Sequence, residues 1–220
     1  MFDDLTAQVR GRHLGPTLAQ ANGDQLIHGA RQDLAAPCRQ KPLSLTPPTA
    51  LDLAAGCVGS VTVIGGPVIE FRPAAVDAGD GELLVQAMRD EIAELYDGLD
   101  LDGPTMPAAG ASELRAPGGG FVVGYVDATP ACCGGVKRLD ERSCEIKKMY
   151  VVPPLRGRGV ARALLHELED VARRLGYELV RLDTGPHQGH AQTLFESEGY
   201  TPIEDFNGNP IAVFWGEKPI

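Results

Sequence analysis

The sequence predicts a mixed α/β (α+β) domain over residues 61–220, preceded by a poorly ordered N-terminal extension over residues 1–60. Apolar residues after position 60 recur with periods of about two or about 3.6. The resulting elements follow in the order β-α-β-β-β-α-β-α-β. Residues 1–60 show neither period, and the proline-rich run 41–48 would stop any helix or central strand. A small separate binding module is the alternative interpretation of the extension.

The first elements are a strand, a helix and a long loop. Residues 68–72 alternate apolar and polar side chains as a half-buried strand does, and Pro73 ends the strand. Residues 81–95 carry apolar side chains at helical spacing, which predicts an amphipathic helix. Residues 100–120 are rich in glycine, proline and alanine and are expected to form a surface loop, with a lid over a substrate as the alternative.

A hairpin and a further strand follow this loop. The apolar runs 121–126 and 131–136 flank the short segment 127–130, which indicates a β-hairpin. Residues 145–152 form the next expected strand. Pro153 closes it, because proline cannot donate a hydrogen bond to a sheet.

The last part of the chain is expected to hold two helices and two strands. A long helix should begin after Gly159, and Gly176 stands where a left-handed C-cap belongs. Its apolar stripe, at intervals of three and four, consists of Val160, Leu164, Leu168, Val171 and Leu175. Residues 179–182 are a predicted strand, residues 191–198 a short helix and residues 211–215 the last strand.

Composition narrows the classes of partner and compartment. The net charge of −10 argues against nucleic acid or an anionic membrane as the main partner. Nine acidic residues lie between Asp77 and Asp102 against Arg89 alone, which favours a cationic small molecule. Five cysteines without a CxxC pair favour reduced thiols, a cytoplasmic protein and no metal site. No apolar run reaches the roughly 20 residues that a membrane span needs.

The turn Arg156–Ala161, which precedes the long helix, is the predicted anion site. Gly157 and Gly159 let the backbone approach a ligand, and the helix start beyond them supplies unpaired N–H groups and partial positive charge. Arg156 and Arg158 add cationic donors, so a diphosphate fits this turn better than a carboxylate does. A basic turn that merely links strand to helix is the alternative. The P-loop and dinucleotide-binding glycine motifs are absent from the sequence.

Sequence patterns on both sides of the turn make its assignment more specific. Arg156, Gly159 and Ala161 form an R-x-x-G-x-A pattern, preceded by the strand segment 149–152 and followed by A-x-x-L-F-x-x-x-G-Y over residues 191–200. This arrangement resembles the GNAT superfamily of N-acetyltransferases, whose acetyl-CoA loop is Q/R-x-x-G-x-G/A. The resemblance implies a central mixed, mostly antiparallel sheet, flanked by helices and splayed between its fourth and fifth strands.

The resemblance also implies how acetyl-CoA would bind as the co-substrate. Backbone N–H groups of Met149 and Val151 would face the pantetheine and the thioester carbonyl, where they would stabilise the oxyanion. The segment Arg156–Ala161, with Val160 in it, would hold the pyrophosphate. Gln188 stands where the family often has an asparagine that touches the cofactor.

The proton-transfer groups are expected near the same strand. An alkyl amine is mostly protonated at neutral pH, so a base must take its proton. Glu145 is the leading candidate, with a surface-exposed strand carboxylate as the alternative interpretation. His187 and His190, which flank the start of the last helix, are further candidates, with loop or capping histidines as the alternative. Phe195 stands where family members commonly have a tyrosine that protonates the leaving thiolate, and Tyr150 or Tyr200 would substitute for that tyrosine.

The sequence therefore predicts an N-acetyltransferase, an acyltransferase that moves an acetyl group from acetyl-CoA to an amine of a small, cationic acceptor. The amine would attack directly in a ternary complex. An acyl-CoA-binding regulatory or sensor protein with a degenerate catalytic site is the alternative. The sequence names neither the acceptor nor the oligomeric state, which leaves a homodimer open.

Overall fold

The computed structural model describes residues 59–63 and 66–220, so the predicted extension over residues 1–60 lies almost entirely outside the described residues. The strands are β1 (Gly59–Thr62), β2 (Val68–Pro73), β3 (Gly120–Val126), β4 (Thr129–Arg138), β5 (Ser143–Val151), β6 (Leu179–Thr184), β7 (Thr201–Pro202) and β8 (Phe214–Pro219). The helices are α2 (Gly79–Leu95), α3 (Val160–Arg174) and α4 (Gly189–Ser197), with one 3-10 turn, η1 (Pro153–Leu155). None of the described helices has the length and apolar character needed to span a bilayer.

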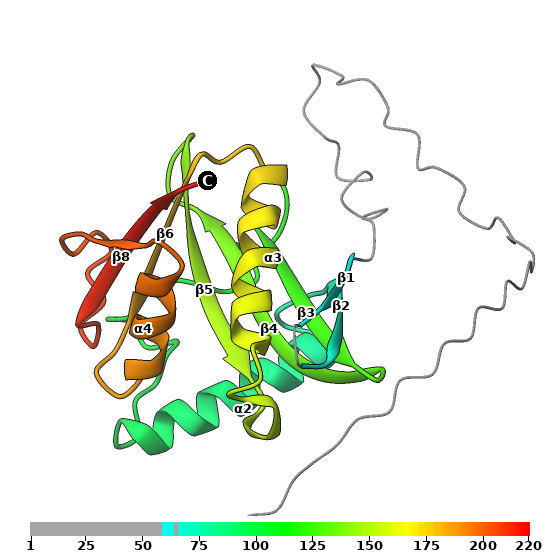
Figure 1. Ribbon diagram of the computed structural model, residues 1–220. Coiled ribbons are helices and arrows are strands. Elements are labelled where there is room, and N and C mark those ends of the chain that lie inside the picture. Colours follow the sequence, from blue (N-terminus) through cyan, green and yellow to red (C-terminus); the bar gives the residue numbers. More distant parts are fainter. Residues whose placement is uncertain (1–58, 64–65) are drawn as a thin grey trace, which may run out of the picture. The chain divides into compact units, whose positions relative to one another are not determined.

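The eight strands form one sheet in the order β1-β2-β3-β4-β5-β6-β8-β7 (Figure 1). Neighbouring strands are antiparallel except β5 and β6, which run parallel. The helix α3 connects this parallel pair, because two parallel strands need a long crossover connection. The predicted mixed, mostly antiparallel sheet with flanking helices is therefore confirmed.

Helices cover both faces of the sheet, and each face has its own apolar core. The helices α3 and α4 lie on one face (Figure 1). There α3 buries Leu164, Leu165 and Leu168 completely, and Phe195 of α4 joins the same cluster. On the other face Val85 of α2 packs among buried side chains of β3 and β4. Full burial of one leucine contributes about 1.5–3 kcal/mol. The helix α3 is thus anchored firmly, and with it the turn at its start.

Glycines set both ends of α3. Gly159 precedes the helix with a φ of 79°, and Gly176 follows it with a φ of 89°. Both angles lie in the left-handed region that glycine adopts without strain. At the C-terminal end, the backbone N–H of Gly176 donates to the Arg173 carbonyl oxygen at 3.0 Å, as a glycine cap allows. The predicted start and end of this helix are confirmed.

The parallel strands β5 and β6 separate soon after they begin. Residues 143–145 pair with residues 179–181, and the pairing of these two strands stops there. From that point β5 continues alongside β4, and β6 alongside β8. The predicted splay between the fourth and fifth strands is confirmed. The two strands are β5 and β6 because β1, which the sequence analysis did not predict, adds a strand before them.

The strand β5 contains a bulge within the part that borders the gap. Lys147 lies opposite Gly135 and Tyr150 lies opposite Cys133, so three steps along β5 match two along β4. Lys148 takes up the extra residue with a φ of 56°, which is uncommon outside glycine. Lys147 and Lys148 both line the cleft described below, as do the neighbouring residues of β5.

The last strand begins later than the sequence predicted. β8 spans Phe214–Pro219, whereas the prediction placed a strand over residues 211–215. Pairing with β6 begins where the backbone N–H of Val213 donates to the last residue of β6 at 3.0 Å. The strand then continues through polar positions, because Glu217 pairs with Arg181 of β6 at 2.8 Å. Cross-strand ion pairs of this kind leave no apolar pattern in the sequence.

Candidate active site

A cleft of about 1020 Å³ opens where β5 and β6 separate. Its walls come from α2, the segment 101–109, β5, the turn before α3 and the segment 182–195, which includes the end of β6. The predicted cofactor residues in the lining are Met149, Val151, Arg156, Gly157, Gly159, Ala161 and Gln188. Arg158 and Val160 are not among the lining residues, since Arg158 is exposed and Val160 packs into the core with 1% exposure.

One end of the cleft is the start of α3. Gly157 and Gly159 both have positive φ values, 71° and 79°, and Gly157 has open space where a Cβ would stand. The helix has no side-chain cap, and the N–H of Ala163 is the one that donates back to the Gly159 carbonyl oxygen, at 3.1 Å. The N–H groups of the first turn before Ala163 therefore have no helical partner. Such a helix start favours an anion such as a phosphate.

Arg156 links this turn to α2 across the cleft. Its Nη2 donates to Glu91 Oε2 at 2.6 Å, and its Nε donates to the Val151 carbonyl oxygen at 2.9 Å. The guanidinium also lies over the Tyr150 ring, 5.5 Å from the centroid. The hydrogen bond to Glu91 raises the pKa of Arg156, which stays charged. Arg156 is therefore a fixed cation in the cleft wall, next to the helix start.

Arg156→Ala is expected to raise the Kd for acetyl-CoA about tenfold, because it removes a charged donor beside the phosphate site. Isothermal titration calorimetry measures this change directly. Arg158→Ala is the matched comparison, because it removes the same charge from an exposed side chain outside the lining. We expect a smaller loss for Arg158→Ala. An unchanged Kd for Arg156→Ala would exclude its predicted role at the pyrophosphate.

Two backbone amides of β5 face the gap. The N–H of Val152 donates to the Ala131 carbonyl oxygen on the β4 side at 3.0 Å. Because successive amides of a strand point to opposite sides, the N–H groups of Val151 and Met149 point away from β4. β6 does not pair with β5 at this level, so these two amides are directed into the cleft. This is the arrangement that the sequence analysis expected for the thioester carbonyl.

Glu145, the predicted base, lies outside the cleft lining. Its side chain has 0% exposure and sits on the part of β5 that still pairs with β6. Its Oε1 accepts from Lys147 Nζ at 2.8 Å and from Asn207 Nδ2 at 2.7 Å, and its Oε2 lies 2.9 Å from Lys137 Nζ. The carboxylate is therefore a buried partner of two lysines. Lys147, which lines the cleft, stands between Glu145 and any ligand.

Lys147 connects Glu145 to Asp183 at the end of β6. Its Nζ donates to Asp183 Oδ2 at 2.7 Å, and Asp183 also accepts from Asn207 and, at 3.2 Å, from Asn209. Burial alone would lower the pKa of Lys147, but the carboxylates of Asp183 and Glu145 outweigh it and raise that pKa. This buried polar network joins β5, β6 and the segment before β8. No sequence pattern indicated it, since its members come from three distant parts of the chain.

Of the two tyrosines predicted to replace the missing acid, Tyr150 lines the cleft. It is 9% exposed, and burial followed by the charge of Glu91 raises its pKa, so the phenol keeps its proton at neutral pH. Phe195 also lines the cleft, but it offers no hydroxyl. Tyr200 packs against Phe195 with ring centroids 5.9 Å apart, and its hydroxyl donates to buried Glu169 at 3.1 Å instead.

Tyr96 bridges the cleft from the end of α2, a contact that the sequence analysis missed. Its hydroxyl donates to Gln188 Oε1 at 2.7 Å and accepts from the His187 backbone N–H at 3.3 Å. Gly185 allows this approach, because a Cβ there would lie 2.2 Å from the Tyr96 hydroxyl. The predicted cofactor residue Gln188 is thus held in place by α2. A glycine after a strand was the one signal in the sequence, and alone it was too weak to use.

The acidic segment 77–102 contributes one carboxylate to the cleft lining, that of Glu91, which Arg156 neutralises. Other members are engaged elsewhere: Asp80 accepts from the Tyr125 hydroxyl at 2.8 Å, and Asp102 pairs with Arg89 at 2.6 Å. The segment's charge is therefore spread over the surface of α2 rather than gathered in the cleft.

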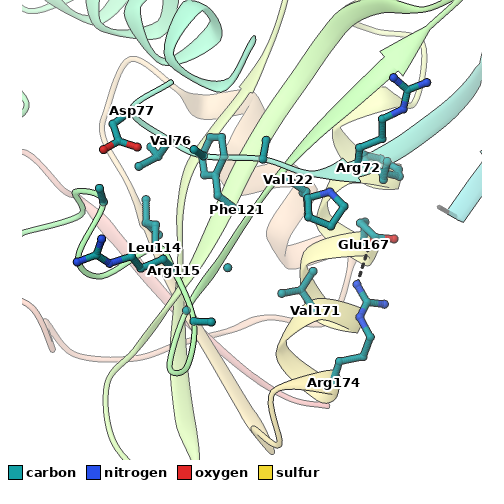
Figure 2. Close-up of a pocket in the computed structure, with 18 residues that line it drawn as sticks. Arg72, Val76, Asp77, Leu114, Arg115, Phe121, Val122, Glu167, Val171 and Arg174 are labelled. Carbon is teal, nitrogen blue, oxygen red and sulfur yellow. Dashed lines mark hydrogen bonds and ion pairs between the residues drawn. The ribbon is translucent and has the colours of Figure 1, made fainter. Parts of the chain in front are cut away.

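A second hollow, of about 620 Å³, lies between the end of β2, the segment 111–122 and the second half of α3 (Figure 2). Apolar side chains such as Phe121 and Val171 form most of its walls. Glu167 is tied to Arg174 at 2.7 Å, and Arg115 extends away from Val171 (Figure 2). No residue predicted to bind the cofactor or to act in catalysis lines this hollow, so the cleft between β5 and β6 is the candidate active site.

Comparisons with known proteins identify the family of this chain. The sequence model of the Acetyltransferase (GNAT) family matches residues 85–200, more than half of the chain. An uncharacterized N-acetyltransferase of Bacillus subtilis, YsnE, is 34% identical over 116 residues, which cover 50% of this chain and 77% of that protein.

Solved structures show the same fold. One is the putative acyl-CoA N-acyltransferase of Klebsiella pneumoniae, with a TM-score of 0.56 and 24% identity over 69% of this chain and 97% of that one. Another is a GNAT family acetyltransferase of Elizabethkingia anophelis with acetyl-CoA bound, with a TM-score of 0.50 and 16% identity over 69% of this chain and 98% of that one. The protein is therefore a member of the GNAT family of acetyltransferases, enzymes that use acetyl-CoA as their co-substrate.

Proposed function

We propose that the protein transfers an acetyl group from acetyl-CoA to an amine of a small, cationic acceptor by direct attack in a ternary complex. The observation that carries this proposal is the splay of β5 from β6, which leaves the amides of Met149 and Val151 directed into a cleft that begins at the start of α3. A cofactor with a diphosphate at one end and a thioester at the other fits both features.

In this mechanism the first turn of α3 and the glycines before it hold the pyrophosphate, and Arg156 adds its charge. The amide N–H of Met149 or Val151 donates to the thioester carbonyl oxygen. As the amine attacks the carbonyl carbon, negative charge develops on that oxygen and the amide stabilises it. The C–S bond then breaks and the CoA thiolate leaves.

The attacking amine must first lose a proton, because the free base is the nucleophile. We propose that Glu145 assists as a positioning residue, since its carboxylate contacts Lys147 and not the cleft. It holds Lys147 and, through it, Asp183 in the cleft wall. Water in the cleft then takes the proton.

Tyr150 is the proposed acid for the leaving thiolate, and Tyr150→Phe is expected to lower kcat about 10- to 100-fold. The effect should stay at this level because a thiol with a pKa of about 8.5 is a tolerable leaving group without protonation. Steady-state kinetics with a thiol-detecting reagent measures it. Tyr125→Phe removes a hydroxyl of the same kind, bonded to Asp80, from a side chain outside the cleft lining. Equal kcat values for the two variants would remove Tyr150 from the mechanism.

CoA release from acetyl-CoA, measured over a broad panel of amines, tests the proposed function. The second candidate, a sensor that binds acyl-CoA without efficient turnover, is favoured by Phe195, which lines the cleft where a phenol is expected. Release of CoA that depends on one class of amine supports the enzyme. Tight binding of acetyl-CoA without release on any amine would support the sensor instead.

A further inference from the structure

One lysine in the cleft has a longer contact with its counter-ion than the other cations of the lining have. Lysine and arginine side chains that line the cleft are Lys147, Lys148, Arg156 and Arg162. Three of these cations have a carboxylate in direct contact. Lys147 contacts Asp183 and Glu145, Arg156 contacts Glu91, and Arg162 contacts Glu198. The exception is Lys148, whose nearest carboxylate among the described residues is that of Asp102, at 3.5 Å. Its side chain is only 7% exposed, and a cation so far from water is costly unless it is paired.

Asp102 cannot neutralise Lys148 fully, because it already serves a second cation. Its Oδ2 lies 2.6 Å from Arg89 Nη2, and its side chain is 46% exposed. Arg89 Nε is buried and has no hydrogen-bond partner among the described residues. Burial lowers the pKa of Lys148 and the charge of Arg89 lowers it further, so the single carboxylate does not offset both effects. Two cations therefore share one half-exposed carboxylate, and of these three groups Lys148 is the one that lines the cleft.

The cleft that Lys148 lines also has apolar walls. The cleft lining near α2 and the following segment includes Met88, Ile92, Leu95, Leu101, Met106 and Ala109. Lys148 directly precedes Met149, whose amide is the proposed donor to the thioester carbonyl. In an α-amino acid the amine and the carboxylate are attached to the same carbon. A carboxylate held by Lys148 would therefore keep the amine close to the thioester, with a side chain among these apolar residues.

We propose that Lys148 binds the carboxylate of the acceptor, and that the acceptor is accordingly an amino acid, or a close analogue, with an apolar side chain. This inference rests on the proposed function and specifies its substrate class. It changes the proposed acceptor from a cation to a zwitterion, whose reacting amine is still an ammonium in solution and whose carboxylate lies beside it. The carboxylate of the acceptor would give Lys148 a second counter-ion, in addition to Asp102, which Lys148 shares with Arg89.

Matched acceptors test the inference on the unaltered protein. L-leucine, L-leucinamide and 3-methylbutylamine share one side chain and differ in whether they carry a carboxylate, a neutral amide or neither. We expect kcat/KM for L-leucine to exceed that for each of the other two by about 10- to 100-fold, the range of a charge-assisted hydrogen bond in a desolvated site. CoA release that is equal or faster with 3-methylbutylamine would overturn the inference while leaving the proposed acetyl transfer intact. No release with any amine would instead contradict the proposed function.

Two variants assign the effect to Lys148. Lys148→Met should bring the ratio of kcat/KM between L-leucine and 3-methylbutylamine close to one, mainly through KM, whereas Lys148→Arg should retain most of the preference because it keeps the charge. Thermal unfolding and the Kd for acetyl-CoA check that both variants are folded. An equal loss of kcat for both acceptors would show that Lys148 acts on the reacting amine itself, and would overturn its assignment to the carboxylate.

Discussion

Lys147→Met is expected to lower the free energy of unfolding by about 3–5 kcal/mol, because it removes the shared partner of two buried carboxylates. The Lys147 side chain is 12% exposed and lies 2.8 Å from Glu145 and 2.7 Å from Asp183. Methionine fills a similar volume but leaves Glu145 with Lys137 and Asp183 with amide donors alone. Urea denaturation followed by circular dichroism measures the loss.

The pH dependence of this loss has a definite sign. In the unaltered protein the pKa of Lys147 is raised, so its stabilising contribution is complete below about pH 10 and is lost as the pH rises through the raised pKa. The deficit of Lys147→Met relative to the unaltered protein should therefore shrink as the pH rises above about 10.

Arg142→Met is the matched control, since it breaks an ion pair with Glu178 in which both side chains are well exposed. Exposed pairs contribute little, so its denaturation midpoint should stay close to that of the unaltered protein. If Lys147→Met shifted the midpoint no more than Arg142→Met does, the buried network would not contribute to stability as we infer.

Local patterns predicted the elements that carry the cofactor site. The helix α3 has an apolar stripe and a glycine at each end, and these features act over a few residues. The hairpin of β3 and β4 and the strand β5 likewise followed from apolar runs bounded by turn residues. The geometry of the turn that we propose to bind phosphate was predictable, because its glycines and the helix that follows are contiguous in the chain.

The acceptor side could not be predicted, because its contacts join distant residues. Tyr96 meets Gln188 across 92 residues, and Lys148 meets Asp102 across 46. The bulge at Lys148 adds to this difficulty, since one extra residue shifts the register of β5 against β4. Glu145 lies two residues from Lys147 on β5 and proved to be a buried counter-ion, because its other partners, Lys137 and Asn207, come from other parts of the chain.

Gly159 offers the sharpest test of the cofactor site, because it can be changed to two residues of nearly the same shape and different charge. Its φ of 79° is one that asparagine and aspartate tolerate better than other side chains do. A Cβ at this position would approach Val63 Cγ1 to 2.5 Å, so Val63 must shift in both variants alike. The difference between Gly159→Asn and Gly159→Asp therefore reports the added charge.

Gly159→Asp is expected to raise the Kd for acetyl-CoA at least about 100-fold, and to bind at least about tenfold more weakly than Gly159→Asn. The carboxylate would occupy the helix start, where it competes with the pyrophosphate for the unpaired N–H groups and repels its charge. The same carboxylate favours the helix itself, so a lower thermal stability than that of Gly159→Asn is not expected. Calorimetry at low and high salt measures the difference in Kd between the two variants. This difference should become smaller at high salt, because salt screens the repulsion. Equal affinities of the two variants at low salt would mean that the phosphates bind elsewhere than at the start of α3.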